Sequence, residues 1–214
     1  MTARRSNSPR DVRRSNELAQ RRADVLAAAA SVFAEKGYHD AQITEIAARA
    51  ELSRASFYAL FEGKGELLQA VIGSAANAIR DTVRGAVERI DDPGERLLCV
   101  IDSLFACYEE DQTLLRIYTL GTHGLPFEIR DAMGDSTMEI FVAFTDWVVA
   151  LAKQAKEAGY LNGLDPVAVG HALVGTVTTT AARWIESTPE RPLSDAALSV
   201  RPIFHRLLGV SEKS

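Results

Sequence analysis

The chain has 214 residues, of which 47% are hydrophobic and 25% charged, which is enough for a sizeable buried core in one or two domains. Its net charge of −5 argues against a protein that coats nucleic acid with its whole surface. No apolar run reaches the ~18 residues of a membrane helix, and the first residues show no apolar signal-peptide core. We therefore expect a cytoplasmic globular protein.

The charges are unevenly distributed along the chain. Residues 1–68 contain 11 Lys and Arg against 9 Asp and Glu, whereas residues 69–214 contain 13 against 20. A basic N-terminal part joined to an acidic remainder favours a nucleic-acid-binding head on a separate body.

The chain begins with a segment rich in Arg, Ser and Pro. Seven arginines stand between Met1 and Arg22, against two acidic residues. We predict that residues 1–16 form a disordered arm in the free protein. Two interpretations stay open: the arm is only solvated, or it also follows DNA phosphates or enters the minor groove.

Helical patterns follow this arm in chain order. A helix over residues 17–36 is ended by Gly37, a natural residue for a helix C-terminus. A helix over residues 43–50 has its apolar residues at i, i+3, i+4 and i+7. Ser53 is a good N-cap for a third helix over residues 54–61.

A tight turn at Glu51 and Leu52 joins these two short helices. Leu52 precedes the Ser53 cap and Phe57 follows the cap by four residues, the spacing of a hydrophobic staple that fixes how the helix starts. Two short helices joined in this way predict a helix-turn-helix. The helix over residues 54–61 is the candidate reader of a DNA major groove.

The remaining chain predicts longer helices. Their expected ranges are 64–90, 93–110, 112–121, 127–158, 166–187 and 194–208, with Met133-Gly134-Asp135 as a candidate interruption. No segment shows sustained period-two alternation, so the predicted fold class is all-α with about nine helices.

The helix over residues 166–187 is suited to contact a second copy of the chain. Gly170, Ala172 and Gly175 are small, which lets another helix approach closely. Helix-turn-helix proteins usually dimerise and place two recognition helices about 34–36 Å apart on a palindromic site. We expect a homodimer; burial of these faces within one chain is the alternative. The predicted interface residues are Leu173, Thr176, Val177, Thr180, Trp184, Ile203 and Leu207.

Other site types are not indicated by the sequence. Cys99 and Cys107 lie about 12 Å apart on a predicted helix, too far for a disulfide, which favours two buried thiols over a redox switch. The four histidines have no metal-binding spacing, so we expect neither a metal nor a cofactor. The usual hydrolase, P-loop, zinc-protease and dinucleotide motifs are missing, so we expect no enzyme.

One continuous stretch carries a family pattern. The matching residues are Gly37-Tyr38, Ile43, Ile46-Ala47, Ala50, Leu52-Ser53-Arg54-Ala55-Ser56-Phe57-Tyr58, Phe61, Lys64 and Leu67. This pattern resembles the TetR family of bacterial transcriptional regulators. The chain departs from it at Glu51, where a turn glycine is usual, and at Gln42, Leu60 and Gly65. The resemblance implies a helix-turn-helix DNA-binding domain over residues 17–63 and a ligand-binding and dimerisation domain over residues 64–214.

The resemblance also implies which residues contact double-stranded DNA. Tyr58 resembles a phosphate-binding tyrosine, and Lys64 resembles a phosphate-binding lysine at the start of a helix, where an anion is favoured. Arg54 has the donors to bind a phosphate or the O6/N7 edge of guanine. The full set of predicted DNA contacts is Gln42, Thr44, Arg54, Ala55, Ser56, Tyr58 and Lys64.

By the same resemblance, an apolar or amphipathic effector binds between the helices of the body. The candidate pocket residues are Phe105, Tyr108, Ile117, Tyr118, His123, Met138, Phe141, Thr145 and His171. The effector would change how the long helix after residue 64 sits, and so release a repressor from a palindromic operator. A ligand-independent regulator and an activator are the alternatives.

Overall fold

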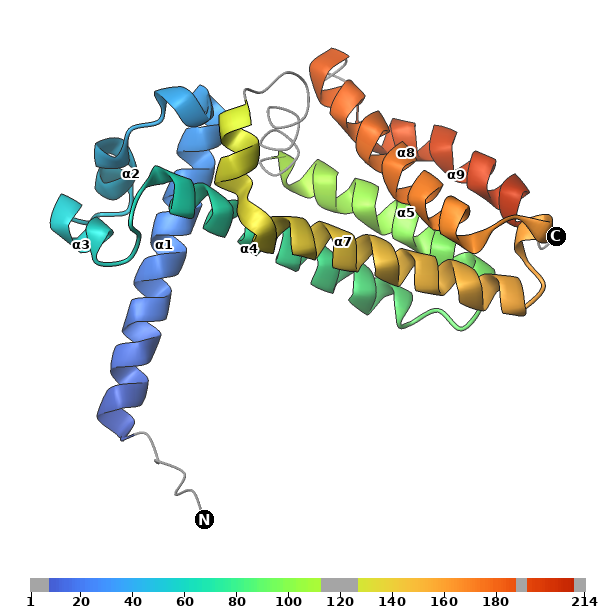
Figure 1. Ribbon diagram of the computed structural model, residues 1–214, viewed down its shortest axis with the longest axis horizontal. Helices are drawn as coiled ribbons and strands as arrows, with labels where there is room; N and C mark the ends of the chain where they lie inside the picture. Colours follow the sequence, from blue (N-terminus) through green and yellow to red (C-terminus); the bar gives the residue numbers. More distant parts are fainter. Residues whose placement is uncertain (1–7, 113–126, 188–191, 210–214) are drawn as a thin grey trace. The chain divides into compact units, whose positions relative to one another are not determined.

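The computed structural model describes the backbone of residues 8–112, 127–187 and 192–209. This part of the chain is helical and contains no strand, which confirms the all-α class (Figure 1). The chain divides into two compact units, Met1–Val71 and Ile72–Ser214, called unit 1 and unit 2 below. The division falls inside a helix rather than at its start, where the sequence placed the domain boundary.

Unit 1 contains α1 (Pro9–Asp40), α2 (Ile43–Arg49), α3 (Arg54–Tyr58) and the beginning of α4 (Lys64–Val87). Gly37 has a φ of +77°, so regular helix ends there as predicted. The core of the unit draws side chains from all four helices and from the turn after α3. Its members include Val25, Ala29, Val32, Phe33, Ile46, Phe57, Phe61, Leu67 and Leu68.

The predicted disorder of residues 1–16 is wrong for residues 9–16, which are helical. The Ser8 Oγ accepts a hydrogen bond from the Asp11 N–H at 3.3 Å, and the Ser8 N–H donates to the Asp11 carboxylate at 3.2 Å. With Pro9 at the first helical position, this capping box starts α1 about two turns earlier than predicted. Residues 1–7 lie outside the described residues.

Unit 2 contains the rest of α4 together with α5 (Pro93–Glu110), α7 (Phe127–Glu157), the 3₁₀ turn η1 (Leu161–Gly163), α8 (Pro166–Ser187) and α9 (Ser194–Leu208). Helix α5 packs against α7, α8 and α9, and α7 packs along α8 (Figure 1). At the end of α7, the Tyr160 hydroxyl donates to the Asp92 carboxylate that caps α5, at 2.6 Å. One apolar core joins these helices.

The helix boundaries of unit 2 follow the sequence closely. Helices α5 and α8 have the predicted bounds, and α7 continues through Met133-Gly134-Asp135 without the predicted interruption. Ser194 is the first residue of α9 rather than its cap. The predicted helix over residues 112–121 lies almost wholly outside the described residues.

Candidate nucleic-acid interface and effector body

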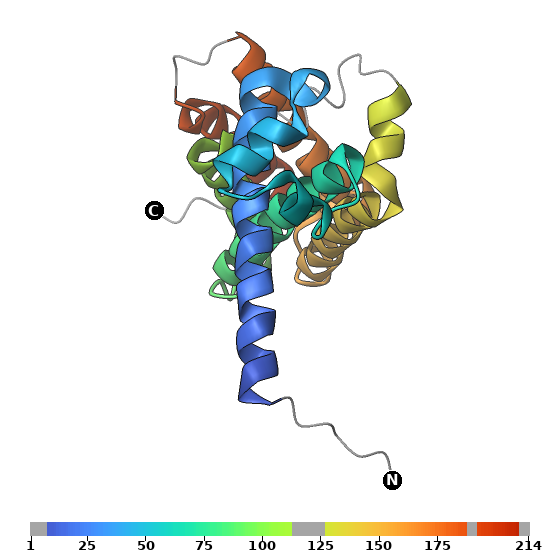
Figure 2. The ribbon, with the colours of Figure 1, turned by 90° about the vertical axis from the view of Figure 1, so that its left-hand side faces the viewer.

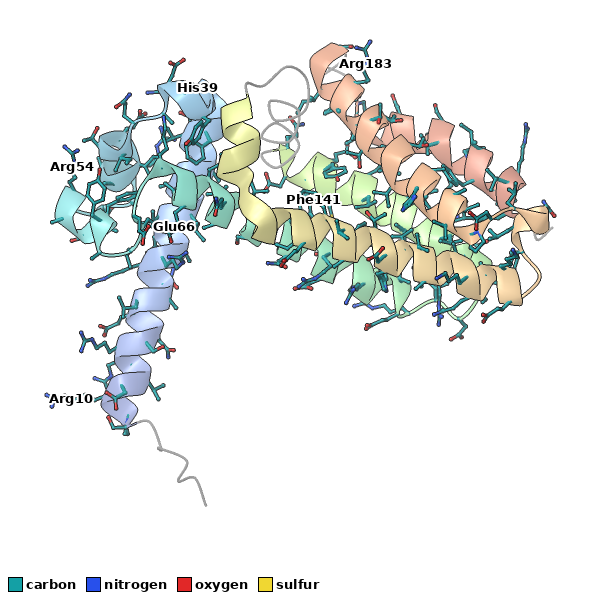
Figure 3. The ribbon with its side chains drawn as sticks, in the orientation of Figure 1. Arg10, His39, Arg54, Glu66, Phe141 and Arg183 are labelled. Carbon is teal, nitrogen blue, oxygen red and sulfur yellow. The ribbon has the colours of Figure 1, made fainter. Side chains whose placement is uncertain are left out.

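Helix α3 has one buried aromatic face and one exposed polar face. Phe57 is fully buried, and its ring centroid lies 5.8 Å from that of buried Phe61. Arg54, Ala55 and Tyr58 are exposed, and Figure 3 shows Arg54 on the outer side of α3. The Arg54 guanidinium lies 5.7 Å from the Tyr58 ring centroid. An exposed polar face on a helix fixed by buried rings is the arrangement that enters a major groove.

Ser53 fixes the start of α3, as the sequence predicts. Its Oγ accepts a hydrogen bond from the Ser56 N–H at 3.1 Å. The Ser56 Oγ lies 2.9 Å from the same Ser53 oxygen. The hydroxyl of Ser56, a predicted DNA contact, is therefore already hydrogen-bonded inside the protein.

The turn between α2 and α3 places Glu51 in the left-handed region, with a φ of +56°. The Glu51 N–H bonds to the Ala48 carbonyl at 3.1 Å and the Leu52 N–H to the Ala47 carbonyl at 2.8 Å, the two bonds of a Schellman motif. Glycine is the usual residue at this position because a Cβ makes the conformation costly. The turn at Glu51, where the family pattern usually has glycine, is therefore strained.

Exposed ion pairs tie α2 to α1. The Arg49 guanidinium donates two hydrogen bonds to the Glu35 carboxylate, at 2.6 and 3.0 Å, and Lys36 Nζ donates to the Glu45 carboxylate at 2.7 Å. Hydrogen bonds from Arg49 and from Ser31 lower the pKa of Glu35 to about 2. These pairs orient α2, which carries the exposed side chain of Thr44 at its start.

Lys64 is engaged within unit 1. Its Nζ donates to the carbonyls of His39 at 2.9 Å and Ala41 at 3.2 Å, and lies 4.6 Å from the Tyr38 ring centroid. Burial lowers the pKa of this ammonium group. An ammonium has three donors, and two of them are used here. Lys64 therefore holds the segment between α1 and α2, and its contact with a phosphate stays a prediction.

Arg22 is a structural residue that sequence reasoning placed only at the margin of an apolar stripe. Its guanidinium donates to the Leu60 carbonyl at 2.9 Å, lies 4.1 Å from the Phe61 ring centroid and pairs with Glu66 at 3.7 Å. Arg22 thereby fixes the turn that follows the recognition helix. No local sequence signal predicts this, because the partners lie 38 or more residues away.

The predicted DNA contacts lie together in unit 1, on α2, α3 and the start of α4. Gln42 and Thr44 are exposed at the start of α2, and Gln42 makes no side-chain capping bond. Arg54, Ala55 and Tyr58 are exposed on α3. Ser56 and Lys64 are half-buried and bonded within the unit, so they have the least freedom to reach DNA.

Only some of the predicted pocket residues lie in the interior of unit 2. Phe105 and Tyr108 are buried in its core. Thr145 is half-buried, and its Oγ1 donates to the Phe141 carbonyl one turn earlier, at 2.9 Å. His171 is exposed on α8, and its role in a pocket stays a prediction. The described part of the chain does not include Ile117, Tyr118, His123 or the side chain of Met138.

The predicted partner-facing side of α8 is also corrected. Leu173 and Val177 are fully buried and Trp184 is 8% exposed, all three in the core of unit 2. A Cβ on Gly170 would lie 2.6 Å from the Val149 side chain and 2.9 Å from its Cα, so this glycine serves the close packing of α8 on α7. Small residues on α8 were therefore misread in part, because close approach within one chain has the same sequence signal as close approach between chains.

A different face of α8 and α9 is exposed. On α8 it carries Ala168, Ala172, Gly175 and Thr179, at helical spacing. On α9, Ile203 is 57% exposed as the prediction requires, and Leu198 is 73% exposed. Half-buried positions among the predicted interface residues are Thr176, Thr180 and Leu207.

A groove of about 450 Å³ lies between α8 and α9, outside the predicted effector region. Five of its eight lining residues are polar or charged; the lining comprises Thr180, Arg183, Trp184, Ser187, Pro192, Asp195, Ala196 and Ser199. Such a lining differs from the mostly apolar pocket expected for an apolar effector.

Other site types are tested for the described residues only. Within residues 8–112, 127–187 and 192–209, no group of three or more His, Cys, Asp or Glu side chains is placed to hold a metal ion. In the same ranges, no helix combines the length and hydropathy required to cross a bilayer. Cys99 and Cys107 are free, half-buried thiols, and burial raises the pKa of Cys107, which disfavours its reactive thiolate.

This fold and this site define a class of protein: a helix-turn-helix DNA-binding unit joined to a larger helical body. Residues 25–71 match the family model of bacterial regulatory proteins of the tetR family. Residues 25–71 therefore resemble the DNA-binding part of tetR-family regulators.

Two relatives are similar to the chain over different lengths. It is 36% identical over 107 residues to the HTH-type transcriptional activator FasR of Mycolicibacterium smegmatis, a match that covers 49% of this chain and 49% of FasR. It is 22% identical over 162 residues to the fatty acid metabolism regulator protein of Bacillus subtilis, covering 75% of this chain and 81% of the relative. The matched segment thus spans about half the length of FasR.

The fold is shared with a solved structure. The transcriptional regulator FadR from Bacillus subtilis, crystallised in complex with stearoyl-CoA, superposes with a TM-score of 0.75. The superposition covers 88% of this chain and 98% of FadR at 21% sequence identity. At that identity the likeness establishes the fold of the chain and not its ligand.

Proposed function

We propose that the protein binds a palindromic operator as a homodimer, and that a small apolar or amphipathic effector controls this binding. The observation that carries the proposal is the exposed Arg54–Tyr58 face of α3, held from behind by buried Phe57 and Phe61. A single recognition helix of this length reaches few base pairs, so a second copy is needed for a specific site.

The exposed side chains have distinct roles in this proposal. Arg54 forms the bidentate pair with guanine, or a charge-assisted bond to a phosphate. Tyr58 donates its hydroxyl to a phosphate, and Thr44 and Gln42 contact the backbone from the start of α2. Lys64 acts mainly by holding the segment from His39 to Ala41, which leads into α2.

The homodimer is supported by the exposed side of α8 and α9. Leu198 and Ile203 are large apolar residues that one copy of the chain leaves in water. The small residues Ala172 and Gly175 on the exposed face of α8 permit a close helix crossing with the second copy. An isologous interface between these faces would give the two-fold symmetry that a palindromic operator requires.

We infer that the effector carries a long acyl chain. Support comes from the Bacillus subtilis relatives, one named for fatty acid metabolism and one solved with stearoyl-CoA. The core of unit 2 is rich in large apolar side chains, including Leu104, Phe105 and Phe144. A repressor released by this effector is the first candidate. An activator is the second candidate, and the name of FasR, a transcriptional activator, favours it.

The proposal is tested in two stages. Footprinting on DNA flanking the gene that encodes the chain should show a palindromic site with half-sites about one helical turn apart. Stearoyl-CoA should then raise the melting temperature and change operator affinity, whereas free CoA should do neither. If stearoyl-CoA binds tightly without changing the affinity for DNA, it is not the controlling effector. Only a ligand with unequal affinity for two states of the protein shifts the equilibrium between them. No protected site at all would overturn the DNA-binding role.

A further inference from the structure

The N-terminal half of α1 extends beyond the packed part of unit 1. Residues 8–21 are all exposed, and the first buried residue of α1 is Val25. Figure 2 shows this segment, in blue, continuing past the cyan turns of α2 and α3. A free helix of this length is marginal in water, but here the packed half of α1 supplies the nucleus and Ser8 caps the end. The segment is therefore an extended, solvent-facing helix.

Its charges have no evident role in folding. Residues 8–22 contain five arginines and two acidic residues. Arg10, Arg13, Arg14 and Arg21 are exposed and form no ion pair with the described residues. Arginines in the first turns lie at the positive end of the helix dipole, where acidic residues are favoured. This placement costs helix stability, so the folded chain alone does not explain it.

Three of the arginines share one side of the helix. At about 100° per residue, Arg10, Arg14 and Arg21 lie within about 40° of one another and on the same side as Leu18 and Val25. Val25 is buried, so this side continues the face with which α1 packs on the rest of unit 1. Beyond the packed part of α1, the same side of the helix exposes arginines to solvent.

Arg22, which lies about 100° around the helix from Arg21, places the turn after the recognition helix beside α1. Arg22 donates to the Leu60 carbonyl in the turn that directly follows α3. Arg10 lies about 18 Å farther along the helix axis, at 1.5 Å per residue, which equals about five base-pair steps of 3.4 Å. Figure 3 shows Arg10 and Arg54 on the same side of α1.

We propose that Arg10, Arg14 and Arg21 form a second DNA contact, which neutralises backbone phosphates outside the base pairs that α3 reads. The proposal rests on the DNA-binding function proposed above. DNA is the occupant that the arrangement favours, because Arg10 lies on the same side of α1 as Arg54 (Figure 3) and the arginines have the opposite charge to phosphate. Phosphate contacts of this kind add affinity and register without reading sequence.

The test uses the full chain and a duplex site selected by the wild-type protein from a random-sequence library. The variant is the triple substitution Arg10→Gln, Arg14→Gln, Arg21→Gln, which keeps good helix formers. The matched control is Arg89→Gln, Lys153→Gln, Lys156→Gln, which removes the same charge from exposed positions of unit 2. Affinity is measured by fluorescence anisotropy between 50 and 300 mM salt, with the site alone and with about five flanking base pairs on each side.

The basic-helix variant should lose about tenfold or more in affinity at 0.1 M salt, and its slope of log K against log salt should fall by about 0.9 per phosphate released. Flanking base pairs should strengthen wild-type and control binding but not variant binding. A variant with the wild-type slope and the wild-type response to the flanks overturns this contact while leaving the helix-turn-helix role intact. A wild-type protein that selects no site overturns the proposed function and this inference together.

Discussion

The two units of the chain differ in the size of their apolar cores. Unit 2 is held by a large apolar core that α4, α5, α7, α8 and α9 all share. Unit 1 is smaller, and its aliphatic core surrounds a few large aromatic side chains such as Phe57 and Phe61. Exposed ion pairs occur in both units, for example Arg49 with Glu35 in unit 1 and Arg201 with Asp102 in unit 2. A small unit buries a smaller share of its surface, so each contact carries more of its stability. The comparison predicts that single substitutions affect unit 1 strongly and locally.

The largest expected effect is that of Phe57→Ala. Phe57 is fully buried behind the recognition helix, so its loss should cost about 3–5 kcal/mol of folding free energy and remove specific DNA binding. Chemical denaturation and anisotropy would measure both. Phe57→Leu, which keeps most of the volume, is the control. If Phe57→Ala unfolds at the wild-type denaturant concentration, the view of unit 1 as dependent on single anchors is wrong.

Lys64→Met should have the next largest effect. It leaves the His39 and Ala41 carbonyls without their donor while keeping the length of the side chain. We expect a loss of about 1–3 kcal/mol in stability and weaker binding to all DNA sequences alike. The salt slope separates two roles of Lys64: a fall of about 0.9 indicates a phosphate contact as well, whereas an unchanged slope leaves only the positioning role. Unchanged stability would contradict the positioning role.

Arg54→Ala tests the exposed face rather than the core. Because Arg54 is exposed, the melting temperature should stay the same, while affinity for the selected site should fall by about 1–3 kcal/mol and specificity should relax at one position. Arg89→Ala, an exposed change in unit 2, is the matched control. Equal affinity for Arg54→Ala and wild type would remove Arg54 from the interface.

Glu51→Gly should stabilise unit 1. The φ of +56° at Glu51 strains an L-residue, and glycine removes that strain at some cost in chain entropy, for a net gain of about 1 kcal/mol. Thermal denaturation should show a higher melting temperature than wild type for Glu51→Gly. It should show no such rise for Glu51→Ala, which keeps the Cβ. A gain for alanine as large as for glycine would place the effect in the glutamate side chain instead.

The smallest effect is a dependence on pH. The pKa of Glu35 is lowered from 4.5 to about 2 in the folded chain, mainly by the hydrogen bonds from Arg49. The stability that ionised Glu35 contributes is therefore present above pH 4.5 and is lost as the pH falls toward 2. Both groups are exposed, so the effect is modest. Melting curves of wild type and Glu35→Gln should differ at pH 7 and converge at acid pH; a constant difference would exclude the ionic cause.

Several parts of the fold follow from local sequence rules alone. Ser53 caps α3, Gly37 ends the regular part of α1 and Pro93 opens α5, as predicted. The same rules contained the true start of α1, since Ser8 and Asp11 have capping-box spacing, but the density of arginines led to a prediction of disorder. Composition was a weaker guide there than the cap.

The sequence by itself determined the all-helical class, the helix-turn-helix and the aromatic face that holds α3, because caps, periodicity and turn residues act over a few positions. Only the tertiary structure decided that Lys64 bonds to the segment before α2, that Arg22 holds the turn after α3, and that Leu173 and Val177 face the core of unit 2. A long side chain has many partners within reach, and an apolar helix has more than one face that could be buried. Which of them is used depends on helices far away in the sequence.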